Sequence, residues 1–198
     1  MRHDPTFWIL ARAAGLTAYV LLTASMLAGL TLKSRVLGRA VKPSAVTDVH
    51  RVLALGGLGA LVLHGVALVM DATVRVTPLA LLVPGLVDYR TWWVGAGVIA
   101  GEVMALVTAS FWARKRIGAK AWRSIHWLSY GAFLLASAHG LMAGSDSGHP
   151  WALGIYAAAL GSVSLATGWR ALAARPARPA ARRSSTRRGA VSTAPERA

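Results

Sequence analysis

Two widely spaced pairs of histidines are the residues of this sequence best suited to chemistry. His64 follows His50 by fourteen positions, and His139 follows His126 by thirteen. An imidazole binds metal ions and exchanges a proton near neutral pH. The chain has no cysteine, which excludes disulfides, iron–sulfur clusters, thiolate ligation and cysteine catalysis. The chemistry available to the four histidines therefore depends on the elements that carry them.

Long apolar segments carry the histidines. Hydrophobic residues make up 55% of the 198 residues and charged residues 15%, whereas an ordinary soluble domain has about 25% charged residues. About 20 apolar residues in a helix cross a hydrocarbon core of about 30 Å. The sequence therefore predicts an all-α, polytopic membrane bundle of five transmembrane helices, the first beginning near residue 7. Their apolar segments are residues 13–32, 52–70, 91–113, 124–145 and 150–169.

The basic residues predict the orientation of this bundle. Of the 22 Lys and Arg residues, only Arg2, Arg12, Arg75 and Arg90 fall on one side. The others follow the first, third and fifth segments, and cytoplasmic loops carry such an excess. We expect residues 1–6 outside, a membrane domain over 7–170, and a disordered basic cytoplasmic tail over 171–198. The positive-inside bias also accounts for the net charge of +15 without nucleic acid.

This topology pairs the histidines by depth. The second and fourth helices run in the same direction, so His50 and His126 lie in the inner half and His64 and His139 in the outer half. The pairs are about 20 Å apart along the helices. A neutral imidazole is an axial ligand of haem iron, and two imidazoles on one iron leave it able to carry electrons but not to bind substrate. Two haems stacked between these helices would form an electron path across the membrane.

Interhelical hydrogen bonding is the alternative role for these histidines. Ionisable groups inside a membrane are rare and usually functional, so four of them paired by depth favour the ligand role. Thirteen helical steps leave His126 and His139 about 140° apart. Tilt, rotamers or a distortion must bring both to their partners. The sequence also predicts that small residues line the space for the haems: Gly56, Gly57, Gly59, Gly65, Gly131, Ala132 and Gly140.

The two histidine spacings resemble those of the ferric reductase-like transmembrane domain. This family includes NADPH oxidases, ferric reductases and the haem-binding subunit of a bacterial methionine sulfoxide reductase system. The resemblance covers residues 7–170 and implies two b-type haems, the inner one on His50 and His126 and the outer one on His64 and His139. It also implies electron flow from a cytoplasmic reductant to an acceptor outside, across the plasma membrane.

The sequence departs from that family in two respects. No segment resembles the flavin and nicotinamide domain that oxidases and ferric reductases usually append, and many members have six helices. The chain is therefore predicted to be the electron-transfer subunit of an oxidoreductase, without catalytic residues of its own. A cytoplasmic flavin reductase or a membrane quinone is the expected electron donor.

Other residues are secondary candidates. Arg12, Arg51 and Arg123 are candidates to contact haem propionates, although snorkelling and topology anchoring explain them equally well. Glu102, in the middle of the third helix, is interpreted as a hydrogen-bonding group, with a proton relay or a quinone contact as the alternative. Phe133 lies between the histidines of its helix, where packing is the simpler role. The outer segment 71–90 is expected to lie at the interface or to cap the helices.

Two other functions remain open from the sequence. One is a quinone-linked cytochrome b subunit, for which Glu102 is the only polar hint. The other is a structural or transport subunit whose histidines bridge helices. His3, Asp146 and His149 form a weak candidate metal site on the outer side.

Overall fold

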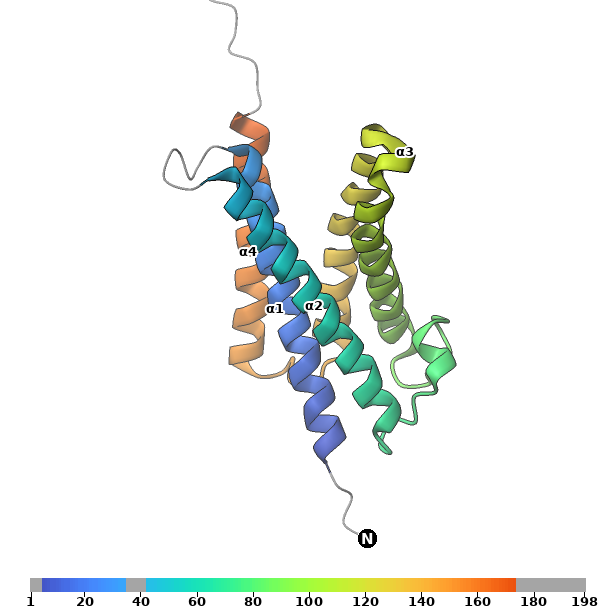
Figure 1. Cartoon of the computed structure of the whole chain (residues 1–198). Coiled ribbons are helices and arrows are strands. Elements are labelled where there is room, and N and C mark those ends of the chain that lie inside the picture. Colours follow the sequence, from blue (N-terminus) through green and yellow to red (C-terminus); the bar gives the residue numbers. More distant parts are fainter. Residues whose placement is uncertain (1–4, 35–41, 174–198) are drawn as a thin grey trace, which may run out of the picture.

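The computed structural model describes residues 5–34 and 42–173, and these residues form helices and connecting turns without a strand (Figure 1). The predicted all-α class is therefore confirmed for the described part of the chain. Residues 1–4, Arg35, Arg39 and the predicted tail from residue 174 onward lie outside it. The elements are α1 (Thr6–Ser34), α2 (Pro43–Met70), the short 3-10 helix η1 (Pro78–Leu81), α3 (Thr91–Ala143) and α4 (Pro150–Ala173).

All four long helices have the length and composition of membrane spans. The shortest has 24 residues, or about 36 Å of helix, and their mean hydropathies lie between 1.3 and 2.2. Large apolar side chains face away from the protein; Trp92 is 88% exposed and Leu165 is 76% exposed. A long helix whose outward face is apolar is stable when that face contacts lipid. The protein is an integral membrane protein.

A single glycine reverses the direction of α3. Within its 53 residues only Gly118 has non-helical dihedrals, with φ 80° and ψ 159°. Backbone with these angles is accessible essentially to glycine alone. The two limbs, residues 91–117 and 119–143, run back alongside one another (Figure 1), and contacts such as the hydrogen bond from Tyr89 to the carbonyl of Ala143 join their far ends.

The interval between the third and fourth apolar segments of the sequence, residues 114–123, is therefore not a loop. These residues are helical on both sides of Gly118. The reason is local composition, because Ala, Arg and Lys are strong helix formers and one glycine is enough to make the turn. The described residues therefore form four long helices rather than the five predicted, because the third and fourth apolar segments lie in the two limbs of α3.

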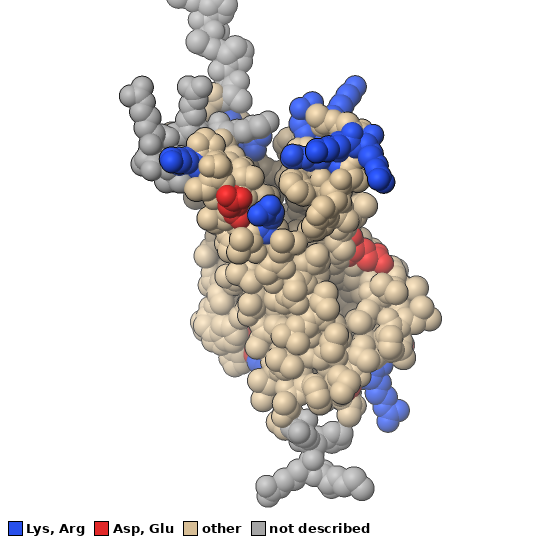
Figure 2. Space-filling model, viewed as in Figure 1, with Lys and Arg blue, Asp and Glu red and all other residues tan. Residues whose placement is uncertain are grey.

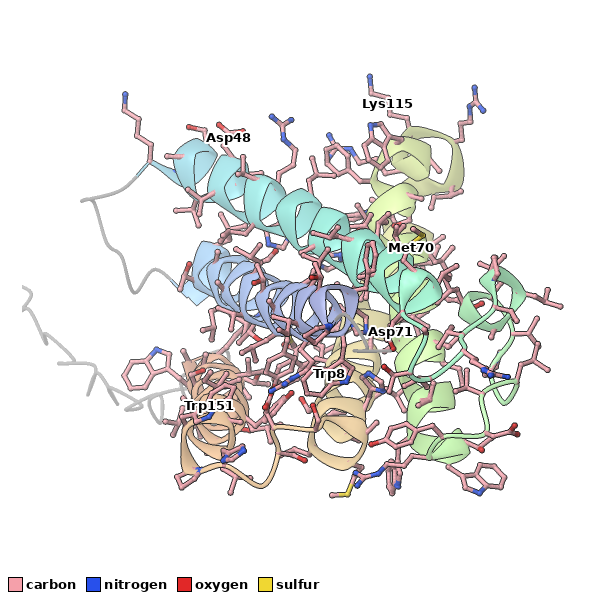
Figure 3. The ribbon with its side chains drawn as sticks, turned by 90° about the horizontal axis from the view of Figure 1, so that it is seen from below. Trp8, Asp48, Met70, Asp71, Lys115 and Trp151 are labelled. Carbon is pink, nitrogen blue, oxygen red and sulfur yellow. The ribbon has the colours of Figure 1, made fainter. Side chains whose placement is uncertain are left out.

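Helix α1 lies between α2 and α4, as the view along the bundle shows (Figure 3). Tyr19 of α1 stacks on Phe133 of α3 with ring centroids 5.9 Å apart, and its hydroxyl is 2.9 Å from the Ser137 hydroxyl. Ala159 and Val163 of α4 complete this buried cluster. This cluster joins α1, α4 and the second limb of α3 at mid-depth.

The two ends of the molecule differ in charge. Figure 2 shows Lys and Arg gathered at the end where α3 turns. The exposed basic residues of that turn are Arg114, Lys115, Arg116, Lys120 and Arg123.

At the opposite end, Asp71 ends α2. Its carboxylate accepts hydrogen bonds from the backbone N–H groups of Thr73 and Val74, an Asx turn that redirects the chain. The following segment folds over the helix ends through buried Val76, Ala80 and Val87.

Candidate cofactor site

One large cavity between the helices is lined by all four paired histidines. Its volume is about 1330 Å³ and its lining is mostly apolar, whereas a pocket for one drug-sized ligand measures about 300–1,000 Å³. Helices α1 and α2 and both limbs of α3 contribute to its wall. Ala80, Leu81 and Val87 of the 71–90 segment also line it. This segment therefore caps the cavity at the end opposite the turn of α3.

The histidines meet across the cavity in the pairs that their depths predict. The ring centroids of His50 and His126 are 6.1 Å apart with an interplanar angle of 70°. Those of His64 and His139 are 6.4 Å apart with an angle of 73°. Each pair joins one ring from α2 to one from the second limb of α3. The two pairs thus have nearly the same internal geometry at two depths.

Backbone carbonyl groups orient three of the four imidazoles. A carbonyl oxygen only accepts hydrogen bonds, so the Nδ1 atom that faces it must carry the proton. In a neutral ring this leaves Nε2 with a free lone pair, the form in which histidine binds metal. The Nδ1–O distances are 2.7 Å from His64 to Ala11, 2.7 Å from His50 to Ser25 and 2.9 Å from His139 to Trp93.

The serine that faces His50 makes a second contact with it. The buried Ser25 hydroxyl lies 2.9 Å from Nδ1 of His50 and donates to the His50 carbonyl oxygen at 3.0 Å. With its own carbonyl also accepting from Nδ1, Ser25 holds both the ring and the backbone of His50. This serine was not a candidate in the sequence, because nothing in the pattern of α1 distinguishes it from other serines in membrane helices.

His126 is held differently. Its ring stacks on Trp122, with centroids 5.3 Å apart and an interplanar angle of 27°. Among the described residues, Nε1 of Trp122 is one of two buried side-chain atoms without a hydrogen-bond partner. A buried N–H group without a partner is costly, so this donor is available to an acceptor bound in the cavity.

The spacing of His126 and His139 does not prevent either from reaching its partner. Between them the helix has no residue with non-helical dihedrals, since Gly118 is the only such residue in α3. The angular difference is therefore absorbed by helix tilt and side-chain rotamers rather than by a break in the second limb.

The glycines closest to the histidines are not those that the sequence singled out. Of the predicted set, Gly65, Ala132 and Gly140 line the cavity, whereas Gly57 packs against Leu22 of α1. The glycines that face imidazole rings are Gly15 and Gly29 on α1 and Gly97 on the first limb of α3. The sequence spacing could have pointed to Gly15 and Gly29, because the interval between them equals that from His50 to His64.

The three candidate arginines have different surroundings. Arg12 forms an ion pair with Asp146, and its guanidinium lies 4.0 Å from the centroid of the Trp8 ring. A guanidinium nitrogen of Arg51 lies 3.8 Å from a carboxylate oxygen of Asp48 in an exposed pair. All three arginines line the cavity. Contacts of these arginines with propionates remain a prediction.

The remaining candidates are placed as follows. Glu102 is on the first limb of α3 and lines the cavity, and Phe133 is buried against Tyr19 at mid-depth. Asp146 is engaged by Arg12, and His3 lies outside the described residues. Within residues 5–34 and 42–173, no group of three or more His, Asp or Glu side chains can hold a metal ion.

Comparison with known proteins gives one match. No curated protein and no solved structure matches the chain. Residues 14–137, more than half of the chain, match the family model described as ferric reductase like transmembrane component. The match includes His50, His64 and His126 and ends two residues before His139, which the geometry pairs with His64. The chain belongs to the family of ferric reductase-like transmembrane components.

Proposed function

We propose that this protein carries electrons across a membrane through two b-type haems, as the membrane component of a reductase system. One histidine of α2 and one of the second limb of α3 hold each haem: His50 with His126, and His64 with His139. The observation that carries the proposal is the pair of facing imidazoles at two depths of one apolar cavity, in a chain of this family.

The separation of the rings supports this assignment. A metal-bound imidazole nitrogen lies about 2.0 Å from the metal, so two imidazoles on opposite sides of one ion have ring centroids about 6 Å apart. The observed separations are 6.1 Å and 6.4 Å. Two rings joined by a direct hydrogen bond would have a shorter separation between their centroids.

The chain's own groups prepare the rings for this role. The carbonyl groups of Ala11, Ser25 and Trp93 hold three of the imidazoles with Nδ1 protonated. Such an outer hydrogen bond fixes the ring orientation and raises the basicity of the other nitrogen. The apolar wall keeps water away from the rings and so favours a neutral donor set.

When bound, a haem with two histidine ligands supplies a one-electron Fe(III)/Fe(II) couple without an open position for substrate. We further propose that the chain crosses the membrane five times, each limb of α3 forming one crossing. The turn of α3 then faces the cytoplasm, in keeping with its exposed basic residues. Electrons therefore pass from the His50–His126 side to the His64–His139 side, and the acceptor lies outside.

The donor is a cytoplasmic flavin reductase or a membrane quinone. The exposed Arg114, Lys115, Arg116 and Lys120 support a docked partner with an acidic face, because opposite charges steer association. A quinone would instead enter from the lipid and reach the cavity. If the partner docks at this turn, reduction by a flavin reductase should slow as salt is added.

Haem analysis of single histidine variants tests the proposal. The purified full chain should contain two haems, with an optical spectrum that changes on reduction by dithionite. His50→Ala and His126→Ala should each remove the same haem, and His64→Ala and His139→Ala the other. The reason is that one remaining axial ligand holds a haem weakly. His149→Ala, on the exposed outer turn, is the matched control and should keep both.

Two results would contradict the proposal. A wild-type chain that is properly folded but colourless after expression with ample haem would leave the histidines as interhelical hydrogen-bonding residues. Identical residual spectra for His50→Ala and His64→Ala would exclude two separate sites.

A further inference from the structure

Three of the imidazoles rest on the same local arrangement of backbone and glycine. In each case Nδ1 faces the carbonyl oxygen of one residue, and the ring lies against a glycine four residues later in the same helix. We call each such pair of a carbonyl group and a glycine a seat. The three seats are Ala11 with Gly15 for His64, Ser25 with Gly29 for His50, and Trp93 with Gly97 for His139. Because residues four apart lie on one face of a helix, the glycine leaves the carbonyl open to a ring.

The absence of a side chain on each glycine makes room for the ring. A Cβ atom on Gly97 would lie 2.6 Å from Nδ1 of His139, and one on Gly15 would lie 2.9 Å from Nδ1 of His64. At Gly29 the nearest ring atoms of His50 would be 3.3 Å away. Carbon atoms in good contact are about 3.5–4.0 Å apart. The three seats therefore tolerate a methyl group to different degrees, Gly97 least and Gly29 most.

The two seats on α1 repeat at the spacing of the histidines on α2. Gly29 follows Gly15 by fourteen positions, just as His64 follows His50. Since α1 and α2 are antiparallel neighbours, the earlier glycine faces the later histidine and the later glycine the earlier one. The same combination of a carbonyl group and a glycine thus occurs at both depths, against His64 and against His50, which argues against an accident of packing.

The fourth imidazole has no such seat. Within the described residues, the ring contacts of His126 are its partner His50 and the Trp122 ring. The outer pair is thus seated on both sides, by α1 and by the first limb of α3. The inner pair is seated on one side only.

We propose that Gly15, Gly29 and Gly97 are positioning residues, which hold His64, His50 and His139 at the orientation needed to ligate haem. This inference rests on the proposed function and adds to it the residues that aim the ligands. It assigns a role to α1 and to the first limb of α3, neither of which contributes a histidine to the pairs.

Alanine variants of the three glycines in the full chain test the inference. Gly97→Ala should displace His139 from the Trp93 carbonyl, so that the haem content falls from two per chain to one or the outer haem loses one ligand. A haem that has lost a ligand binds carbon monoxide when reduced, whereas one with two histidines does not. Gly15→Ala should act on the same haem.

Gly29→Ala should have a milder effect on the other haem. Its Cβ requires a shift of a few tenths of an ångström, so both haems should remain. The low-temperature EPR signal of the inner ferric haem, which depends on the angle between its two imidazole planes, should change. Gly131→Ala is the matched control, because its Cβ meets nothing within 4 Å, and it should leave haem content, carbon monoxide binding and EPR signals unchanged.

The outcomes separate this inference from the proposed function. A wild-type chain without haem overturns the proposed function. A wild-type chain with two haems whose Gly97→Ala and Gly15→Ala variants behave like Gly131→Ala overturns the role of the glycines alone. If Gly97→Ala aggregates, Gly29→Ala decides the question, and an inner EPR signal unchanged from that of Gly131→Ala overturns the inference.

Discussion

The four imidazoles differ in the groups that surround them. His64 and His139 each face one backbone carbonyl, His50 faces a carbonyl and a hydroxyl, and His126 stacks on Trp122. A hydrogen bond from Nδ1 makes the coordinating nitrogen more basic, and a more basic ligand favours Fe(III) over Fe(II). If each pair holds a haem as proposed, these different surroundings would give the two haems different reduction potentials.

Replacement of Ser25 tests this effect at the inner site. Ser25→Ala removes the hydroxyl beside Nδ1 of His50 and leaves the Ser25 carbonyl in place. Both haems should remain. The potential of the inner haem should rise by tens of millivolts, because a hydrogen bond contributes about 0.5–1.5 kcal/mol and a tenfold change in a one-electron equilibrium is about 59 mV. A redox titration followed by optical absorbance measures both potentials.

Ser162→Ala provides the control for this prediction. The Ser162 hydroxyl donates to the carbonyl of Ala159 within α4, and Ser162 does not line the cavity. Its replacement should leave both potentials unchanged. A shift of the outer potential in Ser25→Ala, or no shift at all relative to Ser162→Ala, would contradict the argument.

The elements that carry the histidines could largely be predicted from the sequence. Long apolar segments indicate the helices, and the depth of each histidine follows from its place along them. The way in which α3 turns could not be predicted, because a basic segment of helix-forming residues is typical both of a loop and of a helix end. The seats of the imidazoles could not be predicted either. Every residue has a backbone carbonyl group, so the residue types do not indicate which carbonyl accepts a hydrogen bond from a histidine.

The turn of α3 depends on one residue. Gly118 has φ 80° and ψ 159°, and a Cβ there would meet nothing within 4 Å, so the cost of Gly118→Ala comes from the backbone alone. We expect about 1–3 kcal/mol of destabilisation and a partial loss of haem from both sites, since the second limb carries a ligand of each. Thermal unfolding in detergent, followed by haem release, measures the effect.

A glycine within the second limb serves as the comparison. Gly131 lies in regular helix with open space around it, where alanine is the better helix former. Gly131→Ala should therefore unfold at the same temperature as the wild type or at a higher one. Equal unfolding temperatures for Gly118→Ala and Gly131→Ala would show that the turn does not require a glycine.

Across the whole molecule, the basic residues are distributed unevenly along the bundle axis. Basic residues gather at the turn of α3, and the opposite end is closed by the 71–90 segment and by the Arg12–Asp146 ion pair. If the basic end is cytoplasmic, the proposed function places the inner histidine pair near the donor and the outer pair near the acceptor. The proposed direction of electron flow therefore depends on the orientation of the chain in the membrane.

Single cysteines can report this orientation without background, because the chain has none of its own. A cysteine at Ser44, exposed at the start of α2, should resist an impermeant thiol reagent in intact cells. One at Gly148, exposed in the turn before α4, should react. Both should react in opened membranes, which controls for accessibility. Labelling of Ser44→Cys in intact cells would invert the orientation and the direction of electron transfer.

The matched spacing of the glycines on α1 and the histidines on α2 limits how far apart the two histidine pairs can be. Each interval is two heptads, a period at which antiparallel helices keep the same faces in contact if they wrap gently in a left-handed sense. Inserting one residue between Gly15 and Gly29 would rotate one seat by about 100° relative to the other, so one ring would lose its carbonyl. Along α1 and α2, a change in the distance between the two sites keeps both carbonyl–glycine seats in place when it comes in whole heptads on both helices together, in steps of about 10 Å. If the two pairs hold haems as proposed, such paired steps on α1 and α2 would give a relative of this chain a shorter or longer electron path.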